Sequence, residues 1–443
     1  MGEATFEDIL PELPKLQSSK VQGIFVDVPS YVDEPKSVME NFKDFVAKAK
    51  EFGINVIVDL IPNYVNIEHK FFVQSSKEIS PYDNYFVWAN GKDHDEEGKP
   101  KPPNNWVSTM NESAWSFNAD RDQFYLHQYG VNQPDLNFNN DEVVKEFDNV
   151  IRNYLKGGAA GIRLNKFRQL LVNQSLPDEN AAVGRGSEPG TDHTHYGYWR
   201  HQHTSDLPQL DVLLSRWAGV VAEASGNPSD TVFTVAEEGR PELFMLSRNV
   251  TSLRPVMAAP VYVGENVTAA AHAINVRLSK WPAIQLRSTP EAEVELASLA
   301  LLLPAAPVFD LHQVEAETND TTASESLSHV WSLRHAASVQ HGRHVLMAVP
   351  ATNVTRDTLL ACARWKMGHT GYVAVYNPTL EEQRANLTAL SSLPHSLTVH
   401  HMSHNVRLYT NYTTNYGVSA EDVLVPAQST IVLSYVPVTS IEN

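Results

Sequence analysis

The segment GGAAGIRLNKFRQLL, residues 157–171, joins the end of one predicted helix to a short apolar strand. The run before it, DEVVKEFDNVIRNYLK, has apolar residues at helical spacing, with Asp141 as its N-cap and the two glycines as its end. The strand AAGIRLN carries Arg163 and Asn165 two residues apart, so both point to the same face. A helix that leads directly into such a strand is the repeating unit of a parallel sheet with helices outside it.

This alternation of strands and helices extends from the start of the chain to about residue 340. A helix that ends at Gly53 is predicted at residues 37–53, and further strands at residues 21–29, 54–62, 231–239, 281–287 and 299–309. At a length of 443 residues, the pattern predicts the α/β class and a (β/α)8 TIM barrel. Its first strand is expected to be missing, because the chain starts on what would be the first helix.

Two regions depart from this alternation. Residues 66–133 are rich in Pro, Asn, Asp and aromatic residues without long periodicity, which predicts a small subdomain inserted after the third barrel strand. Short strands separated by turn residues predict an antiparallel β-sandwich domain at residues 344–443. Residues 1–65 and 134–343 are then the two parts of the barrel.

The composition disfavours several kinds of partner and of location. A net charge of −18 argues against binding to nucleic acid or to anionic membrane surfaces, both of which would repel the chain. The one cysteine, Cys362, excludes an intrachain disulfide and is predicted to be buried on a strand. The N-terminal segment does not resemble a signal peptide, and the longest apolar run has 13 residues, against about 20 for a membrane-spanning helix.

Motifs for N-glycosylation point to the outside of the cell. Asn-x-Ser/Thr occurs eight times, somewhat more often than the composition alone predicts. The acceptors are Asn111, Asn173, Asn249, Asn266, Asn319, Asn353, Asn386 and Asn411. We therefore expect this chain at the extracellular face of the plasma membrane, with an anchor absent from the sequence given, or secreted. The alternative is that Asn, Ser and Thr merely cluster in loops.

Polar side chains end four of the predicted barrel strands, at the edge where barrel enzymes keep their active sites. They are Asp59 in VIVDLIPNY, Arg163 and Asn165 in GIRLN, Glu237 in FTVAEEG, and Arg287 in WPAIQLR. Each one alone is more often a capping or solvated residue at a strand end. Four such strand ends on one scaffold predict a shared site.

The motifs around these residues resemble the α-amylase superfamily of glycoside hydrolases, and within it the maltase and oligo-1,6-glucosidase branch. DLIPNY (59–64) resembles the first conserved block, and QPDLNF (133–138) resembles the segment before the fourth strand. GIRLN (161–165) is similar to the nucleophile block Gly-x-Arg-x-Asp. FTVAEE resembles the acid/base block, with Glu237 as general acid, and WPAIQLR occupies the place of the Asn-His-Asp block.

Departures from the family pattern predict a loss of catalysis. Retaining glycosidases need a carboxylate nucleophile beside the acid/base residue, and Asn165 offers an uncharged amide instead. Arg287 brings a cation to a place where the family has a carboxylate and where positive charge develops. Tyr64 stands where the family has a sugar-contacting His. Glu237 without a nucleophile offers only general acid catalysis, worth roughly 10²–10⁴-fold.

The family has an inactive branch, the ectodomains of the heavy chains of heteromeric amino-acid transporters. This chain resembles them in its lost catalytic residues, its sequons and its PPNNWVSTMNESAWSF insertion. The resemblance implies a membrane transporter light subunit as partner, no cofactor and doubtful sugar binding. Two alternatives stay open: an active α-glucosidase that recruits Asp135, Glu238 or Asp310, and a non-catalytic sugar-binding or adhesion module.

Two weaker signals concern metals and sugars. The segment HTHYGYWRHQH is interpreted as carrying solvated loop histidines rather than a metal site, because it has no cysteine; they are His193, His195, His201 and His203. The aromatic side chains Trp106, Trp115 and Phe117 are predicted to form the core of the inserted subdomain rather than a platform for a sugar.

Overall fold

The computed structural model describes most of the chain, in two compact units. The described residues are 6–32, 35–182, 192–226, 230–236, 260–280, 282–311, 330–352, 356–390 and 392–438. Unit 1 comprises residues 1–10, 23–236 and 242–255, and unit 2 comprises residues 11–22, 237–241 and 256–443. The predicted domain boundaries at residues 65, 133 and 343 remain predictions.

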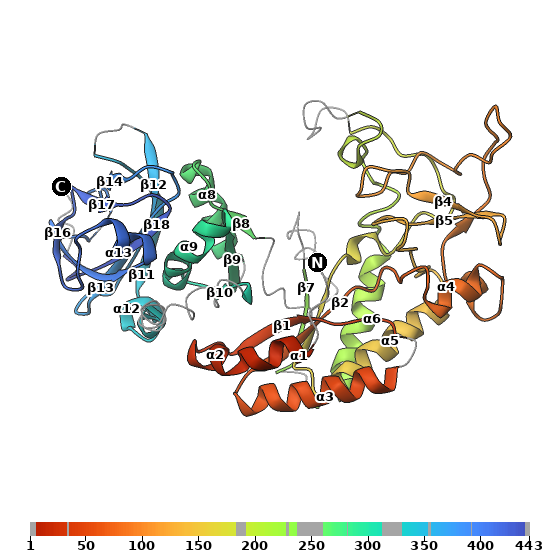
Figure 1. Cartoon of the computed structure of the whole chain (residues 1–443), viewed down its shortest axis with the longest axis horizontal. Coiled ribbons are helices and arrows are strands. Elements are labelled where there is room, and N and C mark those ends of the chain that lie inside the picture. Colours follow the sequence, from red (N-terminus) through yellow and green to blue (C-terminus); the bar gives the residue numbers. More distant parts are fainter. Residues whose placement is uncertain are drawn as a thin grey trace. The chain divides into compact units, whose positions relative to one another are not determined.

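Unit 1 is built around a parallel four-stranded sheet in the order β1-β2-β6-β7. Its strands are β1 (Gly23–Asp27), β2 (Asn55–Leu60), β6 (Gly161–Leu164) and β7 (Val232–Val235). Its helices are α1 (Phe6–Ile9), α3 (Pro35–Glu51), α4 (Lys70–Ser75), α5 (Asp141–Lys156) and α6 (Leu210–Ala224). Helices α3, α5 and α6 alternate with the strands along the chain and pack beside the sheet (Figure 1), which confirms the predicted strand–helix units.

Local sequence explains the ends of these elements. Gly53 adopts a positive φ of 72° just after α3, as a residue that ends a helix commonly does. Helix α5 is capped by Asn140, whose side chain accepts a hydrogen bond from the Glu142 N–H, so the prediction of Asp141 as N-cap is wrong by one residue. Gly161 is required at the start of β6, because a Cβ there would lie 2.4 Å from the Val232 carbonyl oxygen.

The inserted region contains an antiparallel sheet in the order β3-β5-β4. Its strands are β3 (Trp88–Ala89), β4 (Trp115–Asn118) and β5 (Gln123–Leu126). Trp106 and Trp115 are 2% and 3% exposed, and their rings stack with centroids 5.8 Å apart, so the prediction that they form this core is confirmed. The same prediction is wrong for Phe117, which is 41% exposed because it faces outward from β4.

Unit 2 begins with α2 (Leu13–Ser18) and contains a parallel three-stranded sheet in the order β10-β9-β8. Its strands are β8 (Val261–Tyr262), β9 (Ala283–Arg287) and β10 (Ala306–Val308), and the two helices that follow β8 and β9 are α8 (Val267–Leu278) and α9 (Pro290–Leu302). The strand predicted at residues 299–309 is therefore shorter than expected: residues 306–308 form β10, whereas residues 299–302 are the last turn of α9. Helix α9 is buried on nearly all sides, including at Glu293 and Glu295, so its sequence lacks the helical periodicity of a half-exposed helix.

The C-terminal part of unit 2 is an antiparallel β domain, as predicted. Its six-stranded sheet has the order β11-β12-β13-β18-β15-β16, and β14 pairs with β17 in a second sheet. The strands are β11 (Arg343–Pro350), β12 (Asp357–Trp365), β13 (Gly371–Asn377), β14 (Gln383–Ala385), β15 (Ser396–Met402), β16 (Gly417–Ser419), β17 (Val423–Val425) and β18 (Ser429–Tyr435). Helix α12 (Ala337–Gln340) precedes β11, and α13 (His404–Tyr409) follows β15. Helices α8 and α9 contact both this sheet and the parallel one (Figure 1).

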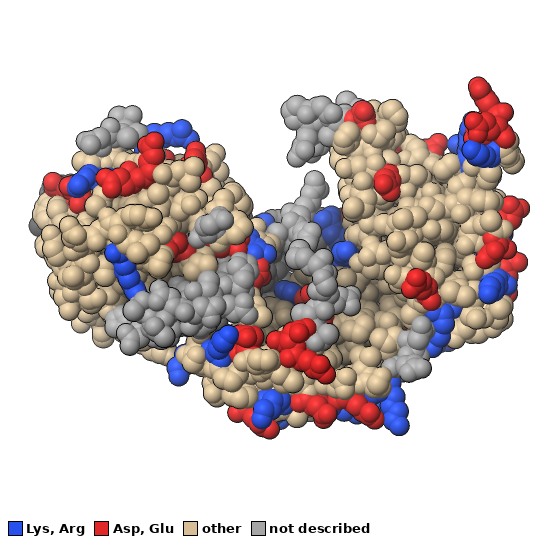
Figure 2. Space-filling view, viewed as in Figure 1, with Lys and Arg blue, Asp and Glu red and all other residues tan. Residues whose placement is uncertain are grey.

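Two properties of the described residues bear on location and partners. No helix among them is long and apolar enough to cross a membrane. Acidic residues outnumber basic ones by 52 to 34 in the whole chain. On the face shown in Figure 2, the basic side chains are scattered among acidic ones, so this face offers no basic patch for a polyanion.

The Cys362 thiol is buried on β12, as predicted, and burial raises its pKa to about 12. Because the thiolate is the reactive form, we expect native protein to resist iodoacetamide at pH 8 and to react fully once unfolded. Mass spectrometry of the alkylated protein measures this. A Leu408→Cys variant, whose new thiol stands at a position that is 59% exposed in the same unit, should react under native conditions and serves as the control.

Candidate functional site

A row of four residues crosses the carboxyl end of the sheet in unit 1. The parallel register pairs Asp27 with Asp59, Asp59 with Arg163, and Arg163 with Thr234. Because residues paired in register point to the same face of a sheet, the predicted residues Asp59 and Arg163 are neighbours. Thr234, the last member of the row, is fully buried.

Asp59 and Arg163 form a two-pronged ion pair. The Arg163 Nε donates to Asp59 Oδ1 at 2.6 Å, and its Nη2 donates to Asp59 Oδ2. The Arg163 guanidinium also lies 3.8 Å from the centre of the Phe25 ring, which is a cation–π contact. Asp59 is 5% exposed, and burial raises its pKa while the hydrogen bonds and charge of Arg163 oppose that rise. The pair therefore holds β2 against β6 with its carboxylate fully engaged.

Asn165 follows β6 and lies beside this pair. Its backbone N–H donates to the Leu60 carbonyl oxygen at 2.8 Å, which continues the ladder between β2 and β6. A hydrogen bond from its side chain to Asp59 also opposes the rise in the pKa of that carboxyl group. The amide thus acts as a hydrogen-bond donor toward a buried carboxylate, a role that an ionised aspartate at position 165 would replace with charge repulsion.

Lys166 places a cation next to Asn165, and the sequence did not predict it. Its backbone is left-handed, with φ of 52°, and its Nζ donates to the Tyr64 hydroxyl at 3.0 Å. The ammonium lies 5.1 Å from the Tyr64 ring centre and 4.7 Å from that of Tyr129. The Tyr129 hydroxyl in turn donates to the Gln169 side chain at 2.6 Å. We call Lys166, Tyr64 and Tyr129 the lysine–tyrosine cluster.

Buried polar groups support the cluster from below. The Gln169 carbonyl oxygen accepts hydrogen bonds from the side chains of Asn63 and Gln128, both at 2.9 Å. Gln128 also binds Asp135 twice, through its backbone N–H at 3.2 Å and its side-chain amide at 2.6 Å. Asp135 is 1% exposed, and burial raises its pKa to about 8. Asp135 is therefore a buried part of the scaffold, closed off from solvent.

Arg287 ends β9 in unit 2, where two carboxylates surround it. Its Nη1 lies 3.3 Å from Glu293 Oε2 and forms an ion pair with Asp310. The Gln285 side chain donates to the same Asp310 at 2.9 Å. The charge of Arg287 is therefore paired within unit 2, which the sequence did not predict. Glu237 and Glu238 lie outside the described residues.

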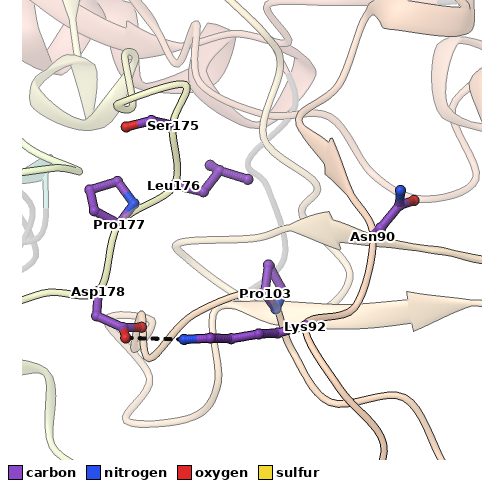
Figure 3. Close-up of a pocket in the computed structure, with 7 residues that line it drawn as sticks. All are labelled: Asn90, Lys92, Pro103, Ser175, Leu176, Pro177 and Asp178. Atoms are coloured by element: carbon purple, nitrogen blue, oxygen red, sulfur yellow. Dashed lines mark hydrogen bonds and ion pairs between the residues drawn. The ribbon is translucent and has the colours of Figure 1, made fainter.

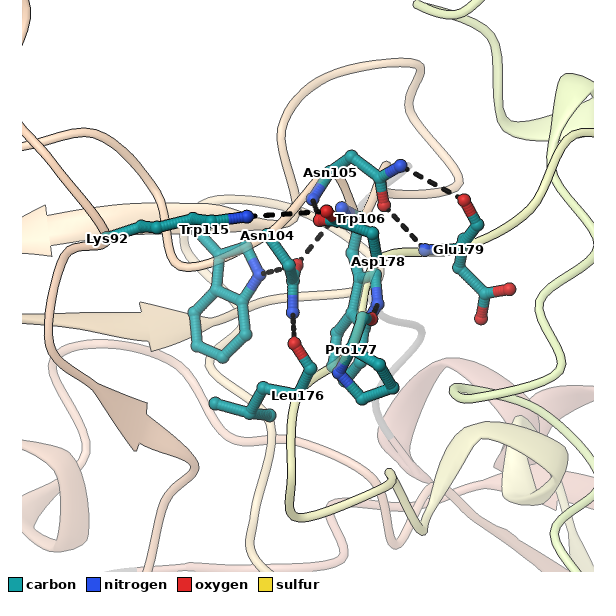
Figure 4. Close-up of polar contacts among 9 residues, drawn as sticks. All are labelled: Lys92, Asn104, Asn105, Trp106, Trp115, Leu176, Pro177, Asp178 and Glu179. Atoms are coloured by element: carbon teal, nitrogen blue, oxygen red, sulfur yellow. Dashed lines mark hydrogen bonds and ion pairs between the residues drawn. The ribbon is translucent and has the colours of Figure 1, made fainter.

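In the inserted region, the side-chain amides of Asn104 and Asn105 bind the backbone of residues 176–179 (Figure 4), and we call this contact the asparagine clamp. The Asn104 side chain donates to the Leu176 carbonyl oxygen at 3.1 Å and accepts from the Trp115 indole at 2.7 Å. The Asn105 side chain donates to the Glu179 carbonyl oxygen at 3.1 Å and accepts from the Glu179 N–H at 2.7 Å. The two asparagines of the PPNN motif therefore bind a segment more than 70 residues away, a contact that the sequence did not predict.

A shallow pocket of about 470 Å³ opens beside this clamp (Figure 3). Its lining residues are Asn90, Lys92, Pro103, Ser175, Leu176, Pro177 and Asp178. Lys92 and Asp178 face each other at 3.4 Å across one side, and both are more than half exposed. The two charges neutralise each other and stay accessible to water, so the pocket offers a ligand no concentrated charge.

We expect the Asn104→Ala variant to lose about 2–3 kcal/mol of the free energy of unfolding of unit 1, because it leaves the buried Trp115 indole N–H without its acceptor. Hydrogen exchange of the β4 and β5 amides measures the loss. The matched control is Asn90→Ala, which removes one exposed hydrogen bond to Gln123 and should cost less than about 0.5 kcal/mol. Equal losses in the two variants would contradict the assignment of the clamp.

The predicted loop histidines make separate local contacts. His201 stacks on Tyr196 at 3.6 Å between ring centroids, and His195 Nδ1 lies 3.1 Å from Asp192 Oδ1. His203 lies 3.4 Å from the Asn173 side chain, and the His193 carbonyl oxygen accepts from Trp199. Among the described residues, no group of three or more His, Cys, Asp or Glu side chains is arranged to hold a metal ion.

Five of the eight predicted sequons lie in described residues, and they differ in exposure. Asn111, Asn266 and Asn411 are exposed, whereas Asn173 and Asn386 are half-buried. Asn266 is the N-cap of α8, and the Asn111 side chain accepts from the Tyr196 N–H at 2.9 Å. In each half-buried sequon, the Asn side chain accepts from the Ser or Thr hydroxyl two residues later. Asn249, Asn319 and Asn353 lie outside the described residues.

Residues 31–253 match the family described as alpha amylase, catalytic domain. This chain belongs to that family. It is 34% identical over 240 residues to Maltase A1 of Drosophila melanogaster, a match that spans 53% of this chain and 39% of the maltase. It is 36% identical over 200 residues to the human amino acid transporter heavy chain SLC3A1, spanning 44% of this chain and 28% of the heavy chain.

Two solved structures have a similar fold. The alpha-glucosyl transfer enzyme XgtA matches with a TM-score of 0.68 at 16% identity, over 97% of this chain and 95% of the enzyme. The trehalulose synthase MutB A258V variant matches with a TM-score of 0.67 at 15% identity. At such identities the likeness concerns the fold alone.

The predicted site residues that the structure describes are all engaged with other groups of this chain. Asp59 and Arg163 are bound to each other. Asn165 and Arg287 are both engaged with carboxylates of this chain. The lysine–tyrosine cluster was missed because its members are 102 and 37 residues apart in sequence. The sequence motifs identify Tyr64 only as a residue at a position where the resemblance implies a histidine.

Proposed function

We propose that this protein is a catalytically inactive member of the alpha-amylase family, the extracellular domain of an amino-acid transporter heavy chain that stabilises or traffics a membrane light subunit. The observation that carries the proposal is Asn165. At the position of the family nucleophile it presents an amide bound to Asp59, and Lys166 adds a cation one residue later. The barrel closure expected for this family belongs to the same proposal.

The chemistry of this position opposes glycoside hydrolysis. The transition state is oxocarbenium-like and is stabilised by a nearby carboxylate. Here the neighbouring groups are an uncharged amide and the ammonium of Lys166, which would repel developing positive charge. The Asn165 side chain contacts the Asp59 carboxylate, which is already bound by Arg163 through both oxygens.

Two of the carboxylates that an active enzyme could recruit are already committed. Asp135 is buried beneath Gln128, and Asp310 is bound to Arg287 and Gln285. The third carboxylate that an active α-glucosidase could recruit, Glu238, lies outside the described residues. The maltase relatives keep this alternative open, and an activity measurement decides it.

The purified protein is expected to release no p-nitrophenol from p-nitrophenyl α-glucoside above the uncatalysed rate. The double variant Asn165→Asp, Arg287→Asp, which restores both carboxylates, should show weak turnover if the rest of the cleft is intact. Turnover by the unmodified protein that disappears in Glu237→Gln would contradict the proposal and establish an active glucosidase.

The partner prediction rests on the similarity to the human transporter heavy chain. Co-expression of the full-length protein with candidate amino-acid transporter subunits should raise their level at the cell surface, measured by surface biotinylation. The Glu237→Gln variant is the matched control, because a scaffold does not need this residue for chemistry and the variant should raise the level equally. No effect on any transporter subunit would refute the heavy-chain role.

A further inference from the structure

An exposed aromatic patch surrounds one of the sequons in unit 2. Tyr409 is 68% exposed, Leu408 59% and Tyr416 49%, within the stretch that runs from the end of α13 into β16. Single exposed apolar residues are ordinary, whereas a group of them marks a surface that something covers. The sequon Asn411-Tyr412-Thr413 lies within this group.

The backbone sets the directions of these side chains. Thr410 is extended, with φ of −128° and ψ of 161°, so the residues on either side of it, Tyr409 and Asn411, point to the same side. The Thr410 hydroxyl points inward and donates to the Val406 carbonyl oxygen at 2.7 Å. Asn411 is exposed, as Tyr409 is, so both side chains face solvent.

Tyr412 anchors the segment from the inner side. It packs against the core of the β domain, and its hydroxyl accepts from the Leu424 N–H at 3.1 Å. Its ring lies 5.3 Å from that of Tyr416, which extends the aromatic surface. The inward Thr410 and Tyr412 alternate with the outward Tyr409, Asn411 and Thr413, so the sequon is presented on a fixed backbone.

We propose that Asn411 carries an N-linked glycan whose first N-acetylglucosamine stacks on the Tyr409 ring. The inference rests on the proposed extracellular role. The Asn411 side-chain nitrogen would bond to C1 of the first sugar of a lipid-pyrophosphate-linked oligosaccharide. The bond from C1 to the phosphate oxygen breaks, the lipid pyrophosphate leaves, and the nitrogen loses one proton. The C–H-rich face of the sugar then covers the ring, as apolar groups cover exposed aromatic faces.

The other described sequons lack this arrangement. At Asn111 and Asn266 the side chain already accepts a backbone N–H, and at Asn173 and Asn386 it is half-buried and bound to the sequon hydroxyl. Asn266 offers the matched control. The Thr268→Ala variant removes that sequon on an exposed face of α8 and leaves the N-cap in place.

The test uses the protein secreted from cultured eukaryotic cells, with its glycans trimmed to the first sugar. Mass spectrometry should find a sugar on Asn411. Removing that sequon by Thr413→Ala should lower the Tm by about 2–4 °C, and by less than about 1 °C when Tyr409→Ala is also present. Thr268→Ala should leave the Tm unchanged. Enzymatic removal of the sugar from unmodified protein should reproduce the loss without any substitution.

The outcomes separate the two proposals. A sugar on other sequons but none on Asn411, or an equal loss of Tm with and without Tyr409, overturns the stacked glycan and leaves the extracellular role intact. A protein without sugar on any sequon overturns both. Sugar on Asn411 with a loss that depends on Tyr409 supports the proposal.

Discussion

The Arg163→Met variant is expected to lose about 3–5 kcal/mol of the free energy of unfolding of unit 1, because it leaves the buried Asp59 carboxylate without its partner. The loss should shrink as pH falls. With Arg163 gone, the folded-state pKa of Asp59 stands above its unfolded value of about 3.9. Stability is then greatest below the unfolded pKa and is lost as pH rises through the folded one. Hydrogen exchange of the β2 and β6 amides at several pH values measures both effects.

A compensating variant distinguishes the ion pair from packing. Replacing both partners, as Asp59→Leu with Arg163→Met, leaves no buried charge, and such replacements are often neutral or stabilising. We expect the double variant to recover most of the loss and to show no pH dependence from this site. If the double variant is as unstable as the single one, the contact of Arg163 with the Phe25 ring carries the stability instead.

A surface pair provides the matched control. Arg152 and Glu223 lie 3.5 Å apart in the same unit, with the Glu223 side chain 72% exposed. Arg152→Met should change the stability by less than about 0.5 kcal/mol, because exposed ion pairs contribute little. The contrast matters for function. The pair of Asp59 and Arg163 can hold β2 to β6 in a non-catalytic scaffold as well as in an enzyme. Its presence is therefore no sign of catalysis.

The parts of the fold that could be predicted are those set by local patterns. Strand β2 is a short, largely apolar run and α5 is amphipathic, so their residues alone identify them. Helix α9 could not be predicted from the sequence, because a helix buried on nearly all sides lacks the helical periodicity of apolar residues. The cap of α5 shifted by one residue because Asn140 and Asp141 are equally suited to it by type.

The site was predictable only in part, for a similar reason. Strand register follows from the fold, so residues at strand ends, such as Asp59 and Arg163, could be expected to meet. Lys166 reaches the hydroxyl of a residue 102 positions away, and the sequence holds no local signal of that contact. Likewise, Arg287 is neutralised by Glu293 and Asp310, which lie 6 and 23 residues further along the chain. Charge at a motif position therefore says little until its neighbours are known.

His127 is expected to contribute a loss of about 2 kcal/mol to the stability of unit 1 between pH 7 and pH 4, measured as the change in the difference between the unmodified protein and the His127→Gln variant. This side chain follows β5 and is 2% exposed, and burial lowers its pKa to about 4. Its Nε2 lies 2.8 Å from the Ser116 hydroxyl, and its Nδ1 is buried without a hydrogen-bond partner in the described structure. Protonation would therefore place an uncompensated cation in the core of the inserted region.

The sign follows from the two pKa values. The unfolded chain takes up the proton near pH 6.5, whereas folded His127 stays neutral down to about pH 4. Between these values the unfolded state binds more protons, so stability is complete above about pH 6.5 and is lost as pH falls toward 4. Hydrogen exchange of the β5 amides across this range gives the slope.

The His127→Gln variant tests the assignment, because glutamine can still bond Ser116 but does not titrate in this range. It should be close in stability to the unmodified protein at pH 7 and more stable than it at pH 4, because it escapes the cost of protonation. His94→Gln, at an exposed position of the same region, is the control and should leave the slope unchanged. If the loss of stability toward pH 4 is unchanged in His127→Gln, another group causes it. Asp135 is not that group, because burial raises its pKa to about 8 and its contribution to stability therefore grows as pH falls.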